Sequence, residues 1–384
     1  MNVPKLRFKE FNDEWIETKI QNVATVIGGG TPSTDEPKYW GNEINWFTPS
    51  EIGKTKYVTI SNRKISQDGL KNSSAKLLPK GTILLSSRAT VGEASILLNE
   101  ASTNQGFQSL IVNENNCNEF IYYLKYKYKR EMLIKSFGST FLEISKSNVE
   151  NIKIKIPSKE EQFMIANFLS LLDKKIELQS KKIEDLKLFK KGLHDKLFNE
   201  VTGNVYLLSD IAIFENGKGH ENIVDENGKY ILINSKFIST EGNVTKKCSE
   251  QLTPLFKNDI TMVMSDLPNG KALAKCYYID ENNKYSLNQR ICKIKIKDDS
   301  IINSKYLFYL LDRNPYYLRF DDGVNQTNLK KDDILSLNLV LPSIKDQERN
   351  SKTLTIIDNF IEKENNKLSK LNLLKKGLMQ SMFV

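Results

Sequence analysis

The sequence predicts an α+β protein built from two related domains in tandem, each followed by one long helix of an antiparallel coiled coil. Three observations lead to this fold class: an internal repeat, a coiled-coil spacing inside the repeat, and a looser repetition of the segments outside it. Residues 157–198 align without a gap on residues 342–383, at a constant offset of 185 positions. Because this period is about half the chain, it indicates a tandem duplication and excludes a solenoid of short repeats.

Each copy of the repeat begins with a helix-capping signal. Ser158 stands three residues before Glu161, and Ser343 stands three residues before Asp346. The serine oxygen can accept a hydrogen bond from an unpaired amide of the first turn, and an acid at the third position favours the positive end of the helix. The sequence therefore predicts helices over 158–198 and 343–384, separated by globular segments at 1–157 and 199–342.

Both predicted helices carry apolar residues at alternating spacings of three and four, which is typical of a coiled-coil seam. Polar residues interrupt the two seams at equivalent positions, Gln179 with Glu364 and Lys190 with Lys375. A pseudo-two-fold axis between the halves would make the paired helices antiparallel, whereas the alternative is that each helix packs only on its own domain. The predicted seam residues are Leu169, Leu172, Ile176, Ile183, Leu186, Leu193, Leu354, Ile357, Ile361, Leu368, Leu371 and Leu378.

The globular segments repeat more loosely. Short apolar runs such as 82–85 and 152–156, frequent Gly and Asn turns and a helical pattern near 119–134 predict a small α+β domain that occurs twice. A common frame with divergent interiors is the pattern expected of two recognition domains with different targets.

Composition narrows the class of protein. The chain has 384 residues, 39% of them hydrophobic, and a formal net charge of +9, which suits a polyanionic partner. The first residues are polar, and no apolar run approaches the roughly 18 residues of a membrane span, so we expect a cytoplasmic protein that does not enter a membrane. Four cysteines without a C-x-x-C pair and two histidines cannot supply a zinc site of standard spacing.

Motifs of catalysis are incomplete in this sequence. The glycines of 28–30 lack the lysine and the spacing of a phosphate-binding loop, so a tight turn after a strand is the simpler interpretation. Residues 314–317 read N-P-Y-Y and lack the second proline of the N-P-P-Y of amino-methyltransferases. Since a histidine-based triad and a nucleotide loop are also missing, the sequence predicts a non-catalytic chain with no cofactor of its own.

Residues suited to reading DNA occur at corresponding places in both segments. Arg88 lies among small hydroxyl residues and could donate two parallel hydrogen bonds to a guanine edge, while an amide such as Gln105 could read adenine. The matching stretch in the second segment is 265–271. The alternatives are an ordinary surface loop for Arg88 and backbone hydrogen bonds for the amides. The candidate DNA contacts are Lys54, Lys56, Arg63, Ser87, Arg88, Thr90, Asn104, Gln105, Lys236, Asn269, Lys271, Asn288, Gln289 and Arg290.

The duplicated pattern resembles the specificity (S) subunits of type I restriction-modification systems. The resemblance rests on P-S-x-x-(E/D)-Q, D-x-x-I-E and K-K-G-L, which occur in this order in 157–193 and again in 342–378. The early G-G-T-P-S at 29–33, followed by Tyr-Trp at 39–40 and Asn-Trp at 45–46, is also typical of such subunits. The resemblance extends over essentially the whole chain.

The resemblance implies that each globular segment is a target recognition domain that reads one half of a bipartite, asymmetric site in double-stranded DNA. The helices would set the length of the unread spacer. Two methylation (M) subunits would dock on the chain, and two restriction (R) subunits could join them. S-adenosylmethionine, ATP and Mg would belong to these partner subunits. The alternatives are a coiled-coil scaffold that binds proteins without nucleic-acid specificity, and a stand-alone methyltransferase or nuclease.

Overall fold

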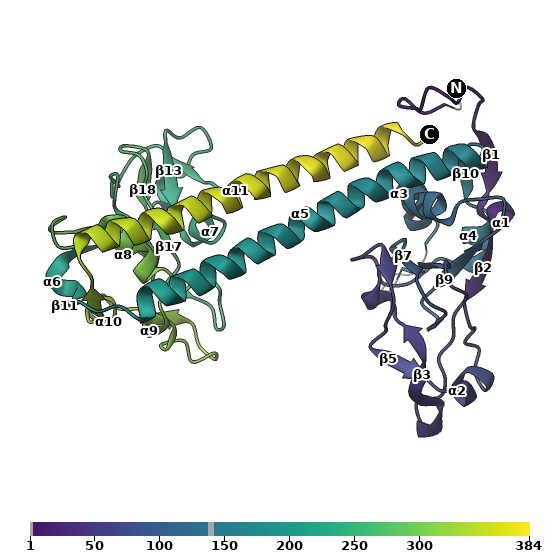
Figure 1. Ribbon diagram of the computed structural model, residues 1–384, viewed down its shortest axis with the longest axis horizontal. Helices are drawn as coiled ribbons and strands as arrows, with labels where there is room; N and C mark the ends of the chain where they lie inside the picture. Colours follow the sequence, from purple (N-terminus) through teal and green to yellow (C-terminus); the bar gives the residue numbers. More distant parts are fainter. Residues whose placement is uncertain (1–2, 137–141) are drawn as a thin grey trace. The chain divides into compact units, whose positions relative to one another are not determined.

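The computed structural model describes residues 3–136 and 142–384 of the chain (Figure 1). It divides into two compact units, one formed by Met1–Lys181 with Asn366–Val384 and the other by Lys182–Asn365. Each unit therefore contains one globular domain together with a part of each long helix. We call the globular parts domain 1 and domain 2.

Domain 1 is built on a five-stranded sheet of order β2-β9-β6-β7-β4, a three-stranded sheet β5-β3-β8 and the antiparallel pair β1-β10. Its elements are β1 (Ile16–Lys19), α1 (Ile20–Val23), β2 (Ala24–Gly28), η1 (Pro37–Tyr39), β3 (Trp40–Phe47), η2 (Pro49–Glu51), β4 (Tyr57–Val58), β5 (Arg63–Ile65), α2 (Gln67–Lys71), β6 (Ile83–Leu85), β7 (Ala94–Leu97), β8 (Ser102–Thr103), β9 (Gln108–Val112), α3 (Asn118–Ile134), α4 (Lys146–Glu150) and β10 (Lys153–Ile156). The strands and the helix predicted from the sequence of domain 1 agree with β6, β10 and α3 to within one residue at each end.

Domain 2 repeats this plan with a four-stranded sheet β12-β19-β15-β17, a three-stranded sheet β14-β13-β18 and the pairs β16-β20 and β11-β21. Its elements are β11 (Asn204–Leu207), α6 (Leu208–Ile211), β12 (Ala212–Asn216), η3 (Glu221–Ile223), β13 (Tyr230–Ile233), α7 (Ser235–Ser239), β14 (Lys247–Cys248), β15 (Ile260–Val263), β16 (Ser265–Asp266), β17 (Cys276–Tyr278), β18 (Tyr285–Leu287), β19 (Ile291–Ile296), α8 (Ser304–Leu311), α9 (Pro315–Leu318), β20 (Thr327–Asn328), α10 (Lys331–Leu335) and β21 (Asn338–Leu341).

The two long helices are α5 (Lys159–Asn199) and α11 (Ile344–Ser381). The predicted caps are present, because the hydroxyl oxygen of Ser158 accepts the amide of Glu161 at 3.4 Å and that of Ser343 accepts the amide of Asp346 at 3.2 Å. A glutamine one position further joins each helix to its domain. Gln162 accepts the amide of Cys117, and Gln347 accepts the amide of Asn303, both at 2.9 Å.

The helices run antiparallel within each unit. In the first unit the end of α11 lies beside the start of α5, where Lys375 pairs with Asp173 (Figure 1). In the second unit the end of α5 lies beside the start of α11, where Lys190 pairs with Asp358. The twelve predicted seam residues are all buried or half-buried. The antiparallel coiled coil is therefore confirmed, and the alternative of two helices packed only on their own domains is wrong.

Each helix ends in the aromatic core of a domain. At the end of α11, Phe383 packs against Phe120 of α3 with ring centroids 5.4 Å apart, and against Trp15 at 6.3 Å. At the end of α5, Phe198 packs against Tyr306 of α8 at 4.8 Å. Since burying an aromatic side chain is worth a few kcal/mol, these contacts fix each helix end on the domain that it reaches.

Candidate nucleic-acid interface

One edge of each domain is formed by a glycine segment after a strand, which packs against an Asn-Gln loop. A Cβ atom on Gly29, just after β2, would lie 2.0 Å from the carbonyl oxygen of Asn104. A Cβ atom on Gly217, just after β12, would lie 2.0 Å from the carbonyl oxygen of Asn288. Only glycine allows this approach. The predicted tight turn after the strand is not present, because residues 29–33 carry no turn and the amide of Gly30 instead donates to the carbonyl of Thr103 at 2.9 Å. We call the edge that carries this glycine segment and the Asn-Gln loop the recognition edge.

Two tryptophans hold the glycine loop of domain 1 in place. The indole N–H of Trp46 donates to the carbonyl of Gly30 at 2.9 Å, and that of Trp40 donates to the carbonyl of Ser33 at 3.0 Å. The guanidinium of the exposed Arg63 lies 3.6 Å from the centre of the Trp40 ring. Arg63 is thus presented on a fixed aromatic support beside the loop.

A hollow of about 550 Å³ at the same edge brings together three residues of the predicted set, Arg88, Asn104 and Gln105. The remaining residues that line it are Pro49, Ser50, Ala89, Gly106 and Glu143. The Nε atom of Arg88 lies 2.8 Å from Oε1 of Glu143, and the Arg88 side chain remains 44% exposed. The carboxylate therefore orients an arginine that still reaches solvent, which is the arrangement that base recognition in a groove requires.

The amides of this hollow divide into an internal and an outward-facing residue. Asn104 is half-buried, and its Oδ1 accepts the amide of Gly106 at 2.9 Å, as one of our alternatives predicted. Gln105 is exposed, and its Oε1 accepts the hydroxyl of Thr31. In the described structure Gln105 is thus the better placed of the two to meet a ligand.

Four backbone hydrogen bonds identify the equivalent positions in domain 2. The amide of Ser87 donates to the Gly106 carbonyl, as that of Met264 donates to the Arg290 carbonyl. The Ser87 carbonyl accepts the Ile144 amide, as the Met264 carbonyl accepts the Leu329 amide. Ser265 therefore stands where domain 1 has Arg88, and its strand partner Asn328 stands where domain 1 has Glu143. The two recognition edges therefore have the same backbone hydrogen bonds but different side chains at equivalent positions.

The candidates of domain 2 lie on the Asn-Gln loop, on α7 and on the loop after β16. Gln289 and Arg290 are exposed, and the side-chain amide of Gln289 donates to Glu221. Asn288 is half-buried like Asn104. The remaining three candidates are exposed and lie on α7 and on the loop after β16: Lys236, Asn269 and Lys271.

Two candidates of domain 1 must be corrected. Lys56 donates to Glu119 at 3.0 Å and to Ser170 of α5 at 2.6 Å, and its side chain is only 9% exposed. It therefore joins the domain to the helix, and burial lowers its pKa although Glu119 favours the charged form. The hydroxyl of Ser87 is fully buried and has no hydrogen-bond partner among the described residues. Lys54 and Thr90 are exposed, as the prediction requires.

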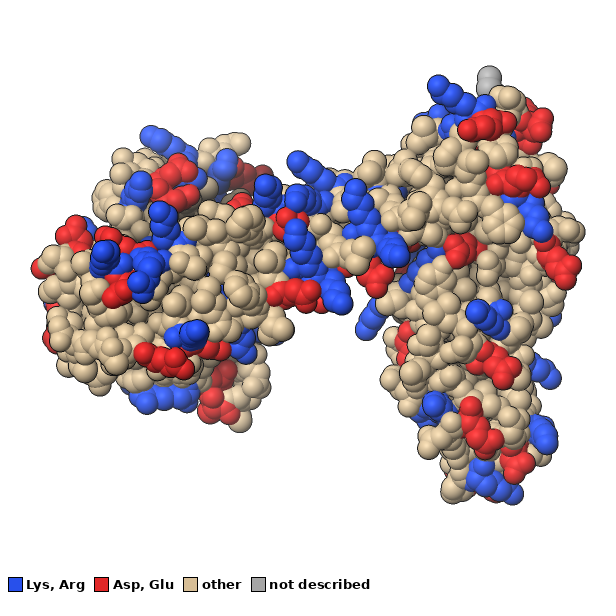
Figure 2. Space-filling model, viewed as in Figure 1, with Lys and Arg blue, Asp and Glu red and all other residues tan. Residues whose placement is uncertain are grey.

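Sequence reasoning missed Glu143, since an acid is not expected at a DNA-binding edge and nothing in the sequence links it to Arg88. On the face drawn in Figure 2, basic and acidic side chains alternate over both domains. Basic side chains gather on that face where α5 and α11 leave the globular parts. That face of the domains thus carries no continuous basic surface.

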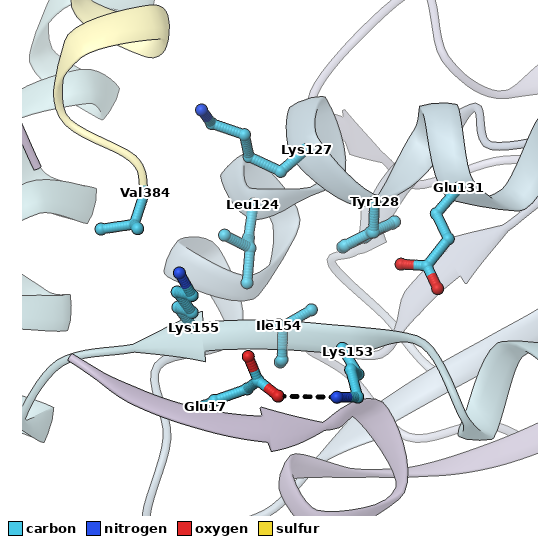
Figure 3. A pocket seen from close by; sticks show the side chains of 9 residues that line it. All are labelled: Glu17, Leu124, Lys127, Tyr128, Glu131, Lys153, Ile154, Lys155 and Val384. Carbon is cyan, nitrogen blue, oxygen red and sulfur yellow. Dashed lines mark hydrogen bonds and ion pairs between the residues drawn. The ribbon is translucent and has the colours of Figure 1, made fainter. Parts of the chain in front are cut away.

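A smaller hollow of about 190 Å³ lies beside α3 and β10 (Figure 3). Its floor is apolar, with Leu124 and Ile154, and an ion pair of 2.9 Å joins Glu17 to Lys153 at its rim. Their hydrogen bond lowers the pKa of Glu17 and raises that of Lys153, so each is held in its charged form. Such groups are poor general acids or bases near neutral pH, and this hollow does not indicate catalysis.

Comparison with known proteins identifies the class of protein to which these edges belong. The family described as "Type I restriction modification DNA specificity domain" matches residues 12–188 and again residues 201–373. The chain belongs to this family. The MjaIX specificity subunit of Methanocaldococcus jannaschii is 30% identical over 401 residues, which cover 94% of this chain and 90% of that protein. The EcoR124I/EcoR124II specificity subunit of Escherichia coli is 27% identical over 197 residues, 47% of this chain and 48% of that protein.

The fold of the specificity-subunit family is also found in solved structures. The S subunit of a type I system from M. genitalium has a TM-score of 0.65 at 18% identity and covers 100% of this chain and 99% of its own. A chain from a study of complex assembly and conformational transition of a type I system has a TM-score of 0.60 at 14% identity, with 96% and 97% covered. At these identities the likeness shows the fold alone.

The described parts of the chain contain neither a helix suited to span a membrane nor a cluster of side chains suited to hold a metal ion. No helix over residues 3–136 and 142–384 is both long and apolar enough to cross a membrane. Among the residues that the structure describes, no group of three or more His, Cys, Asp or Glu side chains is arranged to hold a metal ion.

Proposed function

We propose that this chain is the DNA sequence-specificity subunit of a type I restriction-modification complex, and that each domain reads one half of a bipartite, asymmetric site. The observation that carries the proposal is the difference between two recognition edges on one backbone frame. Domain 1 presents Arg88 held by Glu143, whereas domain 2 has Ser265 and Asn328 at the equivalent positions. Ser265 is buried and its hydroxyl accepts the side-chain amide of Gln326 at 2.7 Å, so Asn328 is the exposed polar group there. Because a guanidinium favours guanine and a side-chain amide favours adenine, unequal half-sites follow.

The helix pair is proposed to set the spacer between the half-sites. A helix of 41 residues such as α5 extends about 60 Å at 1.5 Å per residue. Within each unit, an ion pair of Asp173 or Asp358 fixes the register of α5 against α11, which supports the proposal that the pair acts as a gauge.

The helices are also proposed to dock two methylation subunits. Exposed apolar residues occupy positions on α5 and α11 that are related by the internal repeat: Leu171 with Ile356, Leu188 with Leu373, and Phe189 with Leu374. Exposed apolar side chains at repeated positions are typical of a protein interface. Since the positions occur twice, two copies of one partner are the expected occupants.

Catalysis is proposed to reside in the partner subunits. In this proposal S-adenosylmethionine binds the methylation subunits, and ATP and Mg are used by restriction subunits, of which two could join the complex. This chain would contribute recognition and assembly alone. A protein-binding scaffold without DNA specificity is not favoured, because the family of DNA specificity domains matches both halves of the chain.

The experiment is modification-sensitive sequencing of genomic DNA with and without this gene, in cells that express the methylation subunit. We expect methylation of one gapped, asymmetric motif to depend on the gene. Exchange of residues 199–342 for those of another family member should then change one half-site and leave the other intact. An unchanged methylome, with assembly of the complex verified, would contradict the proposal.

A further inference from the structure

Domain 2 carries two exposed aliphatic side chains at the tip of its recognition edge. Leu267 is 69% exposed and Val324 is 76% exposed, the highest values among the large hydrophobic residues described in 204–341. Leu267 lies on the loop that follows β16, and Val324 lies on the loop that precedes β20. Since β16 and β20 pair with each other, both loops extend from one two-stranded ribbon.

Hydrogen bonds hold both loops in a defined conformation. The carboxylate of Asp266 accepts the amides of Leu267 at 2.9 Å and of Ala272 at 2.7 Å. The carboxylate of Asp322 accepts the amide of Val324 at 2.8 Å. The side-chain amide of Asn269 donates across the two loops to the carbonyl of Gly323 at 3.2 Å. The two aliphatic side chains are therefore presented to solvent by ordered loops, and little conformational entropy remains to be lost on contact.

The equivalent place in domain 1 has a shorter loop and a different chemistry. There, the amide of Ser86 donates to the carbonyl of Glu93, while in domain 2 the amide of Val263 donates to the carbonyl of Lys275, so the second loop is longer. Leu267 follows Ser265, the counterpart of Arg88, by two residues. An apolar pair thus stands at the edge where domain 1 offers a guanidinium.

We propose that Leu267 and Val324 contact the 5-methyl groups of thymine in the half-site that domain 2 reads. This inference rests on the proposed function and deepens it, because it names the base feature that one domain recognises. The thymine methyl is the apolar group that the major groove exposes, and aliphatic side chains are its usual partners.

The two aliphatic side chains carry no charge, and charged groups of both signs lie on the same loops. The nearest carboxylates, those of Asp266, Asp321 and Asp322, accept hydrogen bonds from amides of the same loops. Lys271, a candidate DNA contact, is exposed on the loop of Leu267. Because Leu267 and Val324 are themselves uncharged, we expect them to contribute to sequence discrimination, and their replacement to leave the salt dependence of binding unchanged.

The test uses the assembled complex of this chain with its methylation subunits and duplexes that carry the mapped motif. Each thymine of the domain 2 half-site is replaced in turn by deoxyuridine, which lacks only the methyl group. For at least one position we expect about a fourfold loss of affinity, as for burial of one methyl group. The same replacement in the domain 1 half-site is the control duplex.

The matched protein variants are Leu267→Ala, Val324→Ala and, as control, Ile213→Ala. Ile213 is an exposed aliphatic residue on β12, paired with Lys295 at the end of β19 away from Asn288 and Gln289. Leu267→Ala or Val324→Ala should weaken binding to the thymine duplex to about the level of the deoxyuridine duplex, and should lose sensitivity to the replacement. Ile213→Ala should behave like the unmodified chain.

Three results would overturn the inference. The first is equal affinity for thymine and deoxyuridine duplexes, and the second is a domain 2 half-site without an A·T pair. The third is unchanged DNA binding by both alanine variants, together with the loss of a protein subunit from the assembled complex. The last result would assign the tip to a protein partner. The proposed function fails separately, through the absence of any gapped methylated motif that depends on the gene.

Discussion

The Nζ atom of Lys375 on α11 lies 2.5 Å from Oδ1 of Asp173 on α5. The second Oδ atom of Asp173 accepts the hydroxyl of Tyr123 from α3 at 2.6 Å. One carboxylate thus binds the partner helix and the recognition domain at once. This cluster fixes the register of the two helices and the position of domain 1 on them.

The internal repeat reproduces this cluster in the other unit. Lys190 lies 2.5 Å from Asp358, whose second oxygen accepts the hydroxyl of Tyr309 at 2.7 Å. Lys190 and Lys375, which interrupt the apolar seam in the sequence, are therefore the residues that pair the helices. Polar residues at seam positions cost stability and specify register.

Replacement of Asp173 by leucine should destabilise the chain by about 1–3 kcal/mol, since the hydroxyl of Tyr123 and the ammonium of Lys375 lose their partner in a partly buried site. Urea unfolding measures the free energy. Asp173→Lys combined with Lys375→Asp should recover part of the loss by restoring an ion pair. If the double variant were no more stable than Asp173→Lys alone, the pair would not couple the helices.

Insertion of one heptad after Gln179 in α5 and one after Glu364 in α11 should lengthen the spacer and leave both half-sites unchanged. Seven residues keep the phase of the seam and add about 10 Å, the rise of about three base pairs. Methylome sequencing gives the spacer directly, and a same-length replacement of the heptad at Gln179 is the control. A constant spacer or altered half-site bases would contradict the role of the helices as a gauge.

Arg88→Ala should relax the specificity of one base pair in the domain 1 half-site, at a cost of about 1–3 kcal/mol for the preferred base. Glu143→Gln should produce a weaker effect in the same direction, since it removes the charge that orients the guanidinium. Lys54→Ala, a phosphate-contact candidate, should instead weaken binding to all sequences and lower the salt dependence. Loss of affinity without a change in base preference would show that Arg88 contacts the backbone.

Leu188→Asp combined with Phe189→Asp should reduce the number of methylation subunits in the complex from two to one, because two charges would enter an apolar interface. The repeat-related pair Leu373→Asp and Leu374→Asp should have the same effect, measured by native mass spectrometry. Lys187→Glu, on the exposed surface nearby, serves as the control. Retention of both subunits by both double variants would place the docking site elsewhere.

Stability should rise with pH through Lys125. Burial lowers the pKa of this lysine to about 8 from its ordinary 10.5. Between these values the unfolded chain binds more protons than the folded one, so the free energy of unfolding increases with pH. Below pH 8 the folded chain buries Lys125 in its charged form, at a cost of at most about 3 kcal/mol. The hydrogen bond from the ammonium to the carbonyl of Ala94 offsets part of this cost.

The comparison variant for Lys125 is Lys125→Met, with Arg130→Met as an exposed control on the same helix. Lys125→Met should remove the rise in unfolding free energy between pH 8 and 10, and it should be more stable than the unmodified chain at pH 7. If Lys125→Met and the unmodified chain showed the same dependence of unfolding free energy on pH, Lys125 would not be desolvated in the folded state.

Much of the fold is encoded in local patterns, because coiled-coil spacing, serine caps and the repeat offset are periodic along the chain. Local patterns also marked the Asn-Gln pairs of both recognition edges, but they wrongly predicted a tight turn at the glycines of 28–30. They failed for Lys56 and Ser87, since a lysine in a loop and a serine after a strand look the same in the sequence whether they face solvent or a neighbouring helix. Burial depends on what packs against a residue, and that neighbour can be far away in the chain.

The duplication, the antiparallel helix pair and the family can be inferred from the order of the residues. The folded chain is needed to see that Glu143 holds Arg88, that Ser265 replaces this arginine in domain 2, and that Leu267 and Val324 share one tip. Each of these relationships joins loops through backbone pairing over long separations in the chain. A repeat fixes which backbone positions correspond, whereas the loops between them diverge in length and chemistry, and their side chains meet only after the strands have paired.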